Sequence, residues 1–446
     1  MRVCVVGAGY VGVVTAACLA ELGHMVTCAD VDRDRVDLLS AGKPPVHEKG
    51  LPELLDLHSG ERLRATTDVG GAVAEADLTL IAVGTPSTDE GIDLGAVVAA
   101  TREIGGALAG ADAYSAVVVK STVVPGTTDS VVLPLLAEAS GRAAGRDFGV
   151  GMNPEFLTEG QAVADFMEPD RLVLGGVDER THAALEELYA AFPPSVPRMR
   201  TNTRTAEMVK YASNALLATS ISFANEIANL CAAVGNVDVV EVMDGVHLSR
   251  YLTAVPPEGP PVRAELSSYL AAGSGFGGSC LPKDVRALIA EGGRLGVPMP
   301  LLSAVLDTND ARPDVLVELV ERALGGLAGR EVAVLGIAFK PDTDDVRESP
   351  SIPLVERLVA RGAHVTAHDP VVRTLPAELR DLEVELTDDL DAVLRGREAI
   401  VLATRWEQYL EVPGLLAGRT PPPILVDGRR LLDRSSVENY VGIGLG

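Results

Sequence analysis

The chain has 446 residues, of which 47% are hydrophobic, 23% charged and only 4% aromatic, which excludes a disordered or fibrous protein and predicts a soluble α/β protein. A single hydrophobic core rarely extends beyond about 250–300 residues, so two or three domains are expected. The 38 basic and 63 acidic residues give a net charge of −25, which argues against nucleic acid as a partner because the protein would repel a phosphate backbone.

The cysteines indicate a reducing compartment. Five are present, scattered and without a C-x-x-C pair, which argues against both a disulfide framework and a structural zinc site. The N-terminus enters a β-branched run at once, and no window of about 20 residues is apolar enough to cross a bilayer. We therefore expect a cytoplasmic protein with no bound metal and no membrane partner.

Short β-branched runs alternate with helical stretches over residues 1–200. This alternation is typical of βαβ units in a doubly wound parallel sheet, so an N-terminal Rossmann-like domain is predicted over 1–200. The runs are residues 3–6, 26–29, 78–83, 116–120 and 172–174.

A glycine-rich motif, GAGYVG at residues 7–12, follows the first run, and Asp30 ends the second. The glycines permit a tight turn and close approach of a pyrophosphate, and the acid can accept a hydrogen bond from a ribose 2′-hydroxyl. Asp30 and Asp32 would repel a 2′-phosphate, so NAD is favoured over NADP. Arg33 and Arg35 lie nearby and leave NADP open.

Polar loops follow two further strand patterns of this domain. Thr122 lies in the segment 120–127, and Glu155 and Glu159 lie in the segment 153–160. Open α/β sheets bind ligands at the carboxyl ends of their strands, so these side chains are candidates for a site.

A long helix is predicted between Pro197 and Gly235, because that segment contains neither Gly nor Pro and its apolar residues recur at helical spacing. About 30 residues would span about 45 Å, enough to connect two domains and offer a face to a second subunit. We expect this helix in a helical middle domain, 201–325, and a homodimer. Lys210 and Asn214 share one face of it and could stabilise an oxyanion together.

A second glycine-rich segment, GSGFGGSCLPKD at residues 273–284, leads into another helical pattern. Pro282 suits the first turn of a helix, so Cys280 should lie just ahead of a helix N-terminus, where the helix dipole favours a thiolate. We interpret Cys280 as a nucleophile. The other four cysteines lie in apolar patterns and are interpreted as small buried residues.

The βα alternation restarts at residue 331, with runs at 331–335, 363–367, 399–402 and 424–426. A second Rossmann-like domain is therefore predicted over 326–446. It lacks the G-x-G-x-x-G motif.

Eight motifs in chain order resemble those of the nucleotide-sugar 6-dehydrogenases, the family of UDP-glucose and GDP-mannose dehydrogenases. They are GAGYVG (7–12), VGTP (83–86), KSTVVPGT (120–127), NPEFLTEG (153–160), EMVKYASNALLA (207–218), GFGGSCLPKD (275–284), FKPDTDDVRESP (339–350) and DGRR (427–430). The resemblance implies oxidation of a sugar C6 hydroxymethyl group to a carboxylate with two NAD⁺ and no metal. The intermediates would be a thiohemiacetal and a thioester.

Catalytic roles are carried over from this resemblance. The matching positions are Cys280, Lys210, Asn214, Asp284, Thr122 and Glu155. Cys280 would be the nucleophile, Lys210 and Asn214 would stabilise oxyanions at C6, and Asp284 would order a water together with Thr122. The base for the first alcohol oxidation stays open between Asp284, acting through a water, and neutral Lys210.

Glu155 resembles the general base of the hydrolytic step, and the remaining matches are binding residues. For NAD they are Gly7, Gly9, Tyr10, Val11, Gly12, Asp30, Arg35, Thr85, Thr122, Glu159 and Arg347. For the nucleotide-sugar substrate they are Glu155, Phe156, Leu157, Lys210, Asn214, Arg250, Phe276, Gly277, Lys340 and Arg429. The cations would hold an anionic diphosphate, so the C-terminal domain is expected to bind a nucleoside diphosphate.

The segment 242–268 departs from the usual UDP-glucose pattern, so the nucleotide base and the hexose stay open. UDP-glucose is the preferred substrate, with dTDP-glucose and GDP-mannose as alternatives. Two other classes are weighed: a catalytically silent nucleotide-sugar binding protein, and a single-step β-hydroxyacid dehydrogenase. The latter would need neither Cys280 nor a second Rossmann-like domain.

Overall fold

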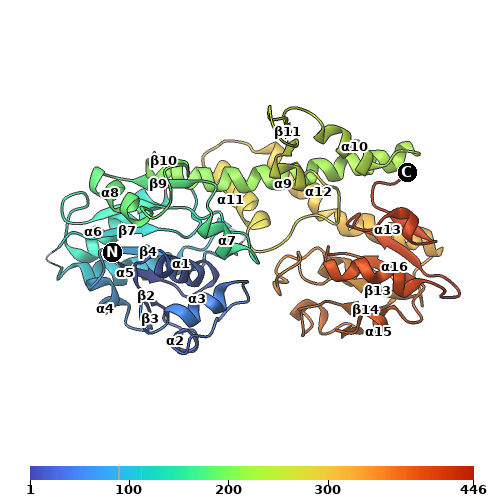
Figure 1. Ribbon diagram of the computed structural model, residues 1–446, viewed down its shortest axis with the longest axis horizontal. Coiled ribbons are helices and arrows are strands. Elements are labelled where there is room, and N and C mark those ends of the chain that lie inside the picture. The colour runs from blue at the N-terminus through green and yellow to red at the C-terminus, as the bar shows by residue number, and fades with distance from the viewer. Residues whose placement is uncertain (89–90, 112) are drawn as a thin grey trace. The chain divides into compact units, whose positions relative to one another are not determined.

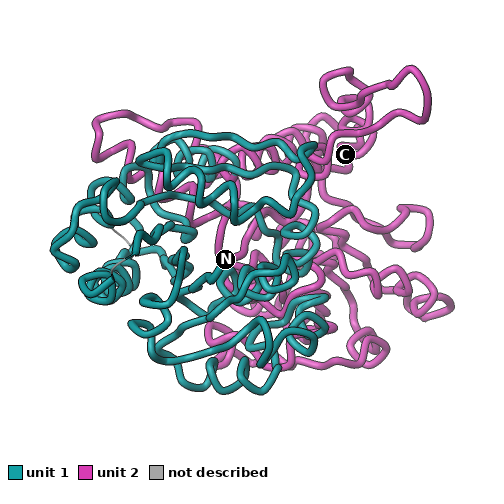
Figure 2. The backbone as a smooth tube through the Cα atoms, turned by 60° about the vertical axis from the view of Figure 1, so that its left-hand side comes forward, with its two compact units in different colours: residues 1–213 teal, residues 214–446 magenta. Residues whose placement is uncertain are grey.

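The computed structural model describes residues 1–88, 91–111 and 113–446. The chain divides into two compact units, 1–213 and 214–446, coloured separately in Figure 2. The boundary falls within one long helix, labelled α9 in Figure 1. Each unit contains one Rossmann-like sheet.

The sheet of the first unit has eight strands in the order β10-β9-β8-β7-β4-β1-β2-β3. The strands are β1 (Arg2–Val6), β2 (Met25–Ala29), β3 (Leu63–Thr66), β4 (Leu78–Ile81), β7 (Ala116–Val119), β8 (Gly149–Met152), β9 (Leu172–Gly176) and β10 (Arg198–Thr201). The first six run parallel, which confirms the predicted doubly wound sheet. At the edge, β9 runs antiparallel to β8, and β10 runs parallel to β9, so the expectation that 172–174 continues the parallel sheet is wrong.

Helices cover both faces of this sheet. They are α1 (Tyr10–Glu21), α2 (Arg33–Ser40), α3 (Leu51–His58), α4 (Val69–Ala74), α5 (Gly95–Leu108), α6 (Leu133–Ser140), α7 (Ala162–Met167) and α8 (Glu179–Leu188). Alternate residues of β1 enter two separate cores: Val3 and Val5 pack with α1 and α3, while Cys4 and Val6 pack with α4 and α5. Because both faces are buried, the strands read as continuous apolar runs. A short antiparallel pair, β5 (Ser87–Thr88) and β6 (Gly91–Ile92), and a π-helical turn, Thr128–Val132, complete the unit.

The predicted long helix is α9 (Thr203–Val234), with 32 residues. Within the part of the chain that the structure describes, α9 alone is long and apolar enough to cross a membrane by length and composition. This differs from the expectation that no window of the sequence would be apolar enough. The mean hydropathy of its best 18-residue window is only 1.2. A core helix of a soluble protein passes the same test, and this one carries Glu207, Lys210 and Glu226.

The second unit begins with the rest of α9 and a mainly helical segment. It contains α10 (Val239–His247), α11 (Leu281–Arg294), α12 (Pro300–Asp310), α13 (Arg312–Leu324) and the short antiparallel pair β11 (Thr253–Ala254) and β12 (Val262–Arg263). The glycine-rich cysteine segment leads directly into α11.

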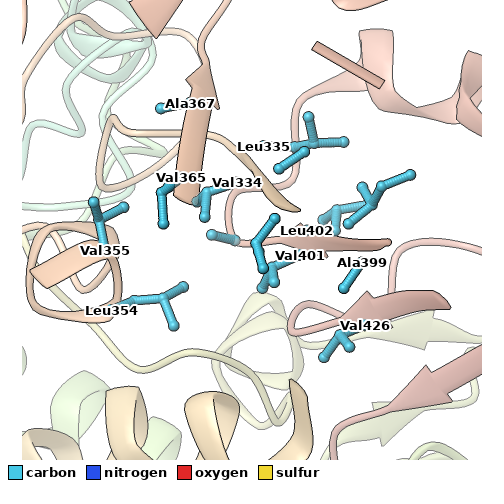
Figure 3. Close-up of a cluster of buried hydrophobic side chains, with 14 of the residues drawn as sticks. Val334, Leu335, Leu354, Val355, Val365, Ala367, Ala399, Val401, Leu402 and Val426 are labelled. Atoms are coloured by element: carbon cyan, nitrogen blue, oxygen red, sulfur yellow. The ribbon is translucent and has the colours of Figure 1, made fainter. Parts of the chain in front are cut away.

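The second Rossmann-like sheet has six parallel strands in the order β15-β14-β13-β16-β17-β18. Its elements are β13 (Glu331–Leu335), β14 (His364–His368), β15 (Val384–Thr387), β16 (Ala399–Leu402), β17 (Ile424–Asp427), β18 (Tyr440–Gly442), α14 (Ser351–Ala360), α15 (Leu390–Leu394) and α16 (Val412–Leu416). Figure 3 shows part of its core, where Val334, Val365 and Val401 come from three neighbouring strands and Leu354 from α14. All four predicted runs are confirmed, and β15 and β18 are additional strands.

Candidate active site

The GAGYVG turn lies between β1 and α1, and its three glycines meet different surroundings. Gly7 has φ +111°, and a Cβ there would lie 2.6 Å from the Ala82 carbonyl oxygen. A Cβ on Gly12 would lie 1.8 Å from the Gly7 carbonyl oxygen, whereas the nearest atom to a Cβ on Gly9 is Arg35 Nη1 at 4.0 Å. The fold therefore requires two of the glycines, and Gly9 leaves open the N-terminus of α1, where a pyrophosphate binds in dinucleotide sites.

Asp30 lies at the end of β2 with 9% of its surface exposed. Its carboxylate accepts hydrogen bonds from the N–H groups of Ala8 and Asp32. Arg35 Nη1 lies 3.9 Å from Asp30 Oδ2, and Arg35 Nε lies 3.4 Å from Asp32 Oδ2. Two acids therefore neutralise the nearest arginine, which fits NAD better than a cofactor with a 2′-phosphate.

Tyr10 connects this turn to the 153–160 segment through Glu48, a residue that sequence reasoning missed. The Tyr10 hydroxyl donates to Glu48, and the Gly160 N–H donates to Glu48 Oε2 at 2.7 Å. Burial and the Glu48 carboxylate raise the pKa of the Tyr10 phenol, so Tyr10 stays a hydrogen-bond donor. Glu48 lies outside every strand or helix pattern of the sequence, which leaves it without a signal.

The loops after β4 and β7 lie side by side because these two strands are neighbours in the sheet, with β4 next to β1. The Thr85 hydroxyl donates to the Thr122 carbonyl oxygen at 2.9 Å. The Ser121 hydroxyl donates to the Val83 carbonyl oxygen at 2.7 Å. Both threonines predicted to contact NAD are thus held together at the carboxyl edge of the sheet.

Lys210 and Glu155 form a buried ion pair in the first unit. The Lys210 ammonium lies 2.9 Å from Glu155 Oε1, and the two side chains are 5% and 6% exposed. The Leu157 N–H donates to Glu155 Oε2 at 2.7 Å. Burial raises the pKa of Glu155, but Lys210, the Leu157 N–H and the charge of Lys120 together outweigh burial and lower it below its ordinary value.

Phe156 lies beside this ion pair. Its ring centroid is 5.6 Å from the Lys210 ammonium and 3.8 Å from the guanidinium carbon of Arg171. Glu159 is half-buried at the far end of the same segment and interacts electrostatically with Tyr10. The structure therefore brings the predicted residues of 153–160 together with Lys210 and with the loop of Tyr10.

Cys280 lies immediately before α11, as predicted, and Pro282 is the second residue of that helix. The thiol is exposed, while the other four cysteines are buried. In the same unit, Asn214 Nδ2 donates to Asp284 Oδ2 at 2.6 Å, and Lys283 Nζ donates to Asp284 Oδ1 at 2.5 Å. Asp284 is thereby fixed in a buried position on the first turn of the helix that Cys280 begins.

The glycines ahead of Cys280 allow close contact with the FKPDTDDVRESP segment. A Cβ on Gly277 would lie 2.2 Å from the Glu348 carbonyl oxygen, and one on Gly278 would lie 2.7 Å from the Phe339 ring. The side-chain amide of Asn309 holds Phe276 through both its N–H, at 2.8 Å, and its carbonyl, at 3.0 Å. These contacts fix the path of the chain up to the thiol.

Arg429 holds the same loop, since its Nη1 donates to the Gly275 carbonyl oxygen at 3.0 Å. Burial, together with the charges of Arg405 and Arg312, lowers the pKa of Arg429 to about 10. Arg312 is fully buried, and its Nε donates to the Gly273 carbonyl oxygen at 3.0 Å. Cationic charge therefore gathers beside the cysteine loop of an otherwise acidic protein, as an anionic substrate would require.

The other predicted cations differ in their surroundings. Lys340 is half-buried, with its ammonium 5.6 Å from the Phe339 ring centroid. Arg347 is exposed and forms an ion pair with Asp345 at 2.7 Å. Arg250 is exposed in the segment between α10 and β11.

The turn after β13 has the backbone of a dinucleotide turn without its free acid. Gly336 has φ +101°, close to the +111° of Gly7. Asp369 at the end of β14 corresponds to Asp30, but it is fully buried and accepts four backbone N–H groups, from residues 337–338 and 371–372, at 2.8 to 3.0 Å. Each oxygen of Asp369 accepts two of these N–H groups, whereas each oxygen of Asp30 accepts one, so this domain lacks an acid with capacity left for an adenosine ribose.

No group of three or more His, Cys, Asp or Glu side chains suited to a metal ion occurs among residues 1–88, 91–111 and 113–446.

Comparison with known proteins identifies the family. Three domain models of the UDP-glucose/GDP-mannose dehydrogenase family match the chain: the NAD-binding domain over 1–193, the central domain over 204–311 and the UDP-binding domain over 333–434. A UDP-glucose 6-dehydrogenase of Haloferax volcanii is 41% identical, with 99% of each chain covered. A GDP-mannose 6-dehydrogenase of Pseudomonas syringae is 38% identical, with 97% of this chain and 95% of the relative covered.

Solved structures agree with this result. A UDP-glucose dehydrogenase from Pyrobaculum islandicum superposes with a TM-score of 0.89 at 42% identity and covers all of this chain and 98% of that one. With matches over all three domains and identities near 40% over its whole length, the chain belongs to the UDP-glucose/GDP-mannose dehydrogenase family.

Proposed function

We propose that this NAD-dependent nucleotide-sugar 6-dehydrogenase acts on UDP-glucose and forms UDP-glucuronate through a thiohemiacetal and a thioester on Cys280. The exposed thiol at the N-terminus of α11, beside an Asp284 held by Asn214 and Lys283, is the observation that carries this proposal. NAD⁺, when bound at the turn of residues 7–12, would accept a hydride from C6.

Cys280 makes the second oxidation possible. An aldehyde is a very poor hydride donor until a nucleophile adds to its carbonyl carbon. Addition of the thiolate forms a thiohemiacetal, which can donate a hydride and become a thioester. The helix dipole of α11 favours the thiolate form of Cys280. Water then releases the carboxylate and restores the thiol.

Two sets of polar groups would serve the developing charges. Lys210 and Asn214 lie one turn apart on α9, which suits stabilisation of an oxyanion at C6. Glu155 has a pKa below its ordinary value and is therefore ionised at neutral pH, so it can accept a proton from the hydrolytic water. Asp284, with Thr122, would order that water. The base for the first oxidation stays open between Asp284 and Lys210.

The choice of UDP-glucose rests on the relatives, among which UDP-glucose 6-dehydrogenases reach 41% identity and GDP-mannose 6-dehydrogenases 38%. The panel to test is UDP-glucose, dTDP-glucose and GDP-mannose, with NADH and consumed sugar nucleotide both quantified. Two NADH per sugar nucleotide, and the highest kcat/KM for UDP-glucose, would support the proposal. One NADH would indicate a single oxidation, and none a binding protein.

Asp30 is expected to set the preference for NAD⁺. A charged hydrogen bond to the ribose contributes about 1.5–3 kcal/mol, so Asp30→Ala should raise the KM for NAD⁺ about tenfold or more and narrow the gap to NADP⁺. Initial rates with both cofactors measure this, with Asp34→Ala on the exposed side of α2 as the control. An unchanged cofactor ratio would place the determinant elsewhere.

We further propose a homodimer formed through α9. Five of its exposed apolar residues are separated by eight, seven, seven and four positions, which are helical spacings that place them in one stripe. They are Met208, Leu216, Phe223, Leu230 and Val234, between 46% and 65% exposed. A second copy of the same helix would cover the stripe.

A charge in this stripe should separate the subunits. Phe223→Lys is expected to give monomers in light scattering at micromolar concentration, because an ammonium would be buried without a partner. The control is Leu57→Lys, which adds the same charge to an exposed leucine of α3. A Phe223→Lys variant with the mass of the wild type would contradict this interface.

A cytoplasmic location is part of the same proposal, and it is supported by five cysteine thiols, none in a disulfide.

A further inference from the structure

We propose that Lys120 is a positioning residue of this reaction, which holds the start of the 153–160 segment through Asn153 and keeps Glu155 ionised beside the substrate. The inference rests on the proposed function of Glu155 as the base of the hydrolytic step. Lys120 was not among the residues that the family motifs assign to the site.

The contacts of Lys120 tie together neighbouring strands. Lys120 directly follows β7, and Asn153 directly follows β8, its parallel neighbour. The Lys120 ammonium donates to Asn153 Oδ1 at 3.0 Å, and the Tyr189 hydroxyl donates to the same oxygen at 2.5 Å. Asn153 Nδ2 donates to the Val173 carbonyl oxygen at 3.0 Å. Asn153, two residues before Glu155, is therefore held through both the oxygen and the nitrogen of its side-chain amide.

The cluster carries more positive than negative charge. It contains two ammonium groups, Lys120 and Lys210, and one carboxylate, Glu155, each less than one-tenth exposed. Both hydrogen-bond acceptors of Lys120 are neutral, the Asn153 amide and the Tyr189 phenol, and the Phe166 ring centroid lies 5.9 Å from its ammonium. Glu155 compensates the charge of Lys120 at longer range.

Titration of these groups is coupled. Burial lowers the pKa of Lys120 to about 8, an effect that Glu155 opposes and Lys210 reinforces. Lys120 in turn lowers the pKa of Glu155, while burial raises that of the facing Tyr189 phenol, which stays neutral. Lys120 and Glu155 therefore influence each other's charge, in addition to the direct ion pair of Glu155 with Lys210.

The ammonium of Lys120 becomes important when an oxyanion forms at C6. Lys210 must then share its charge between the substrate and Glu155, which weakens the support for a buried carboxylate. A carboxylate without that support takes up a proton and can no longer act as a base. Lys120 supplies a positive charge at neutral pH that is not shared with the substrate.

The pH profile of NADH formation at saturating substrate tests this role. In Lys120→Met the acid limb, set by protonation of Glu155, should move up by about one pH unit, because the charge of Lys120 lowers the pKa of Glu155 and a nearby opposite charge shifts a carboxyl group by that order. Lys120→Gln retains a donor for Asn153 without the charge and should show the same displacement with a smaller loss of kcat. Tyr189→Phe removes a hydrogen bond to Asn153 without changing the charge, so its acid limb should stay in place.

Lys43→Met removes an exposed lysine and should match the wild type throughout. An acid limb that stays at the wild-type pH in both Lys120 variants overturns the proposal, as does an equal displacement in Tyr189→Phe. Wild-type enzyme that forms no NADH from any sugar nucleotide would instead refute the proposed function.

A second measurement needs no substrate, so it tests the role of Lys120 separately from the proposed function. Because the folded pKa of Lys120, about 8, lies below its ordinary 10.5, the unfolded chain binds more protons between these values, and this group's contribution to stability rises with pH there. The Tm of Lys120→Met minus that of the wild type should therefore be most positive below pH 8 and decline by pH 9.5. Parallel Tm curves would show that Lys120 does not carry the buried charge, and they would also overturn the proposal.

Discussion

Cys280→Ala is expected to abolish carboxylate formation, with a loss of at least about 10³-fold in turnover, while binding of NAD⁺ and of the sugar nucleotide changes little. The thiol would form a covalent bond in the reaction, but its exposed side chain makes no capping hydrogen bond to α11. Removing it therefore leaves the helix start intact. Product analysis after incubation with NAD⁺ and UDP-glucose, paired with titration calorimetry for both ligands, measures the two effects.

Cys231→Ala provides the matched control, because it removes a buried thiol from α9 and should retain wild-type turnover. Cys280→Ser tests the chemistry more finely, since a hydroxyl is a much weaker nucleophile at neutral pH. Wild-type formation of the uronate in Cys280→Ala would end the thioester mechanism.

Lys210→Met should damage both catalysis and folding. Loss of one oxyanion donor typically lowers kcat by about 10²–10³-fold. Breaking a buried ion pair also leaves Glu155 in an unfavourable position, which costs about 3–5 kcal/mol of unfolding free energy. The loss of unfolding free energy should be larger at pH 8 than at pH 5. Without Lys210, burial raises the pKa of Glu155, so at low pH the carboxylate takes up a proton and no longer buries an unpaired charge. Urea unfolding at both pH values measures it.

The double variant Lys210→Met/Glu155→Gln separates the two effects. With no carboxylate left to compensate, it should regain most of the lost stability, whereas its kcat should stay low. If the single variant loses the same unfolding free energy relative to the wild type at pH 5 and at pH 8, the Lys210–Glu155 pair is not the buried charge pair described here.

The parts of the fold that follow from local patterns were accessible from the sequence. Strands β13 and β16 lie in the core between covered faces, so they appear as unbroken apolar runs, and α9 appears as a long segment free of Gly and Pro. The antiparallel pairing of β9 with β8 could not be predicted, because an apolar run does not indicate in which direction its strand enters the sheet. Strand β15 was missed because most of its residues are only half-buried, which weakens the pattern.

The site divides in the same way. The place of Cys280 follows from Pro282 and the glycines ahead of it, which are local signals. The roles assigned to Lys210 and Glu155 came from a resemblance, and their pairing could not be read from residues 55 positions apart in the sequence. Glu48 and Lys120 gain their importance from burial and from partners in segments distant in sequence, which no local pattern records.

Asp369 shows how a recognition device can persist as architecture. An acid at the end of the second strand is the residue that binds the ribose in a dinucleotide site, yet here its four hydrogen bonds all go to backbone N–H groups, two in the turn after β13 and two in the turn after β14. A carboxylate in this position can be retained because it holds two turns together, whether or not it contacts a ligand. In repeated Rossmann-like domains, therefore, the number of backbone N–H groups already bound to this acid distinguishes a domain in which it can also bind an adenosine ribose from one in which it serves the backbone alone.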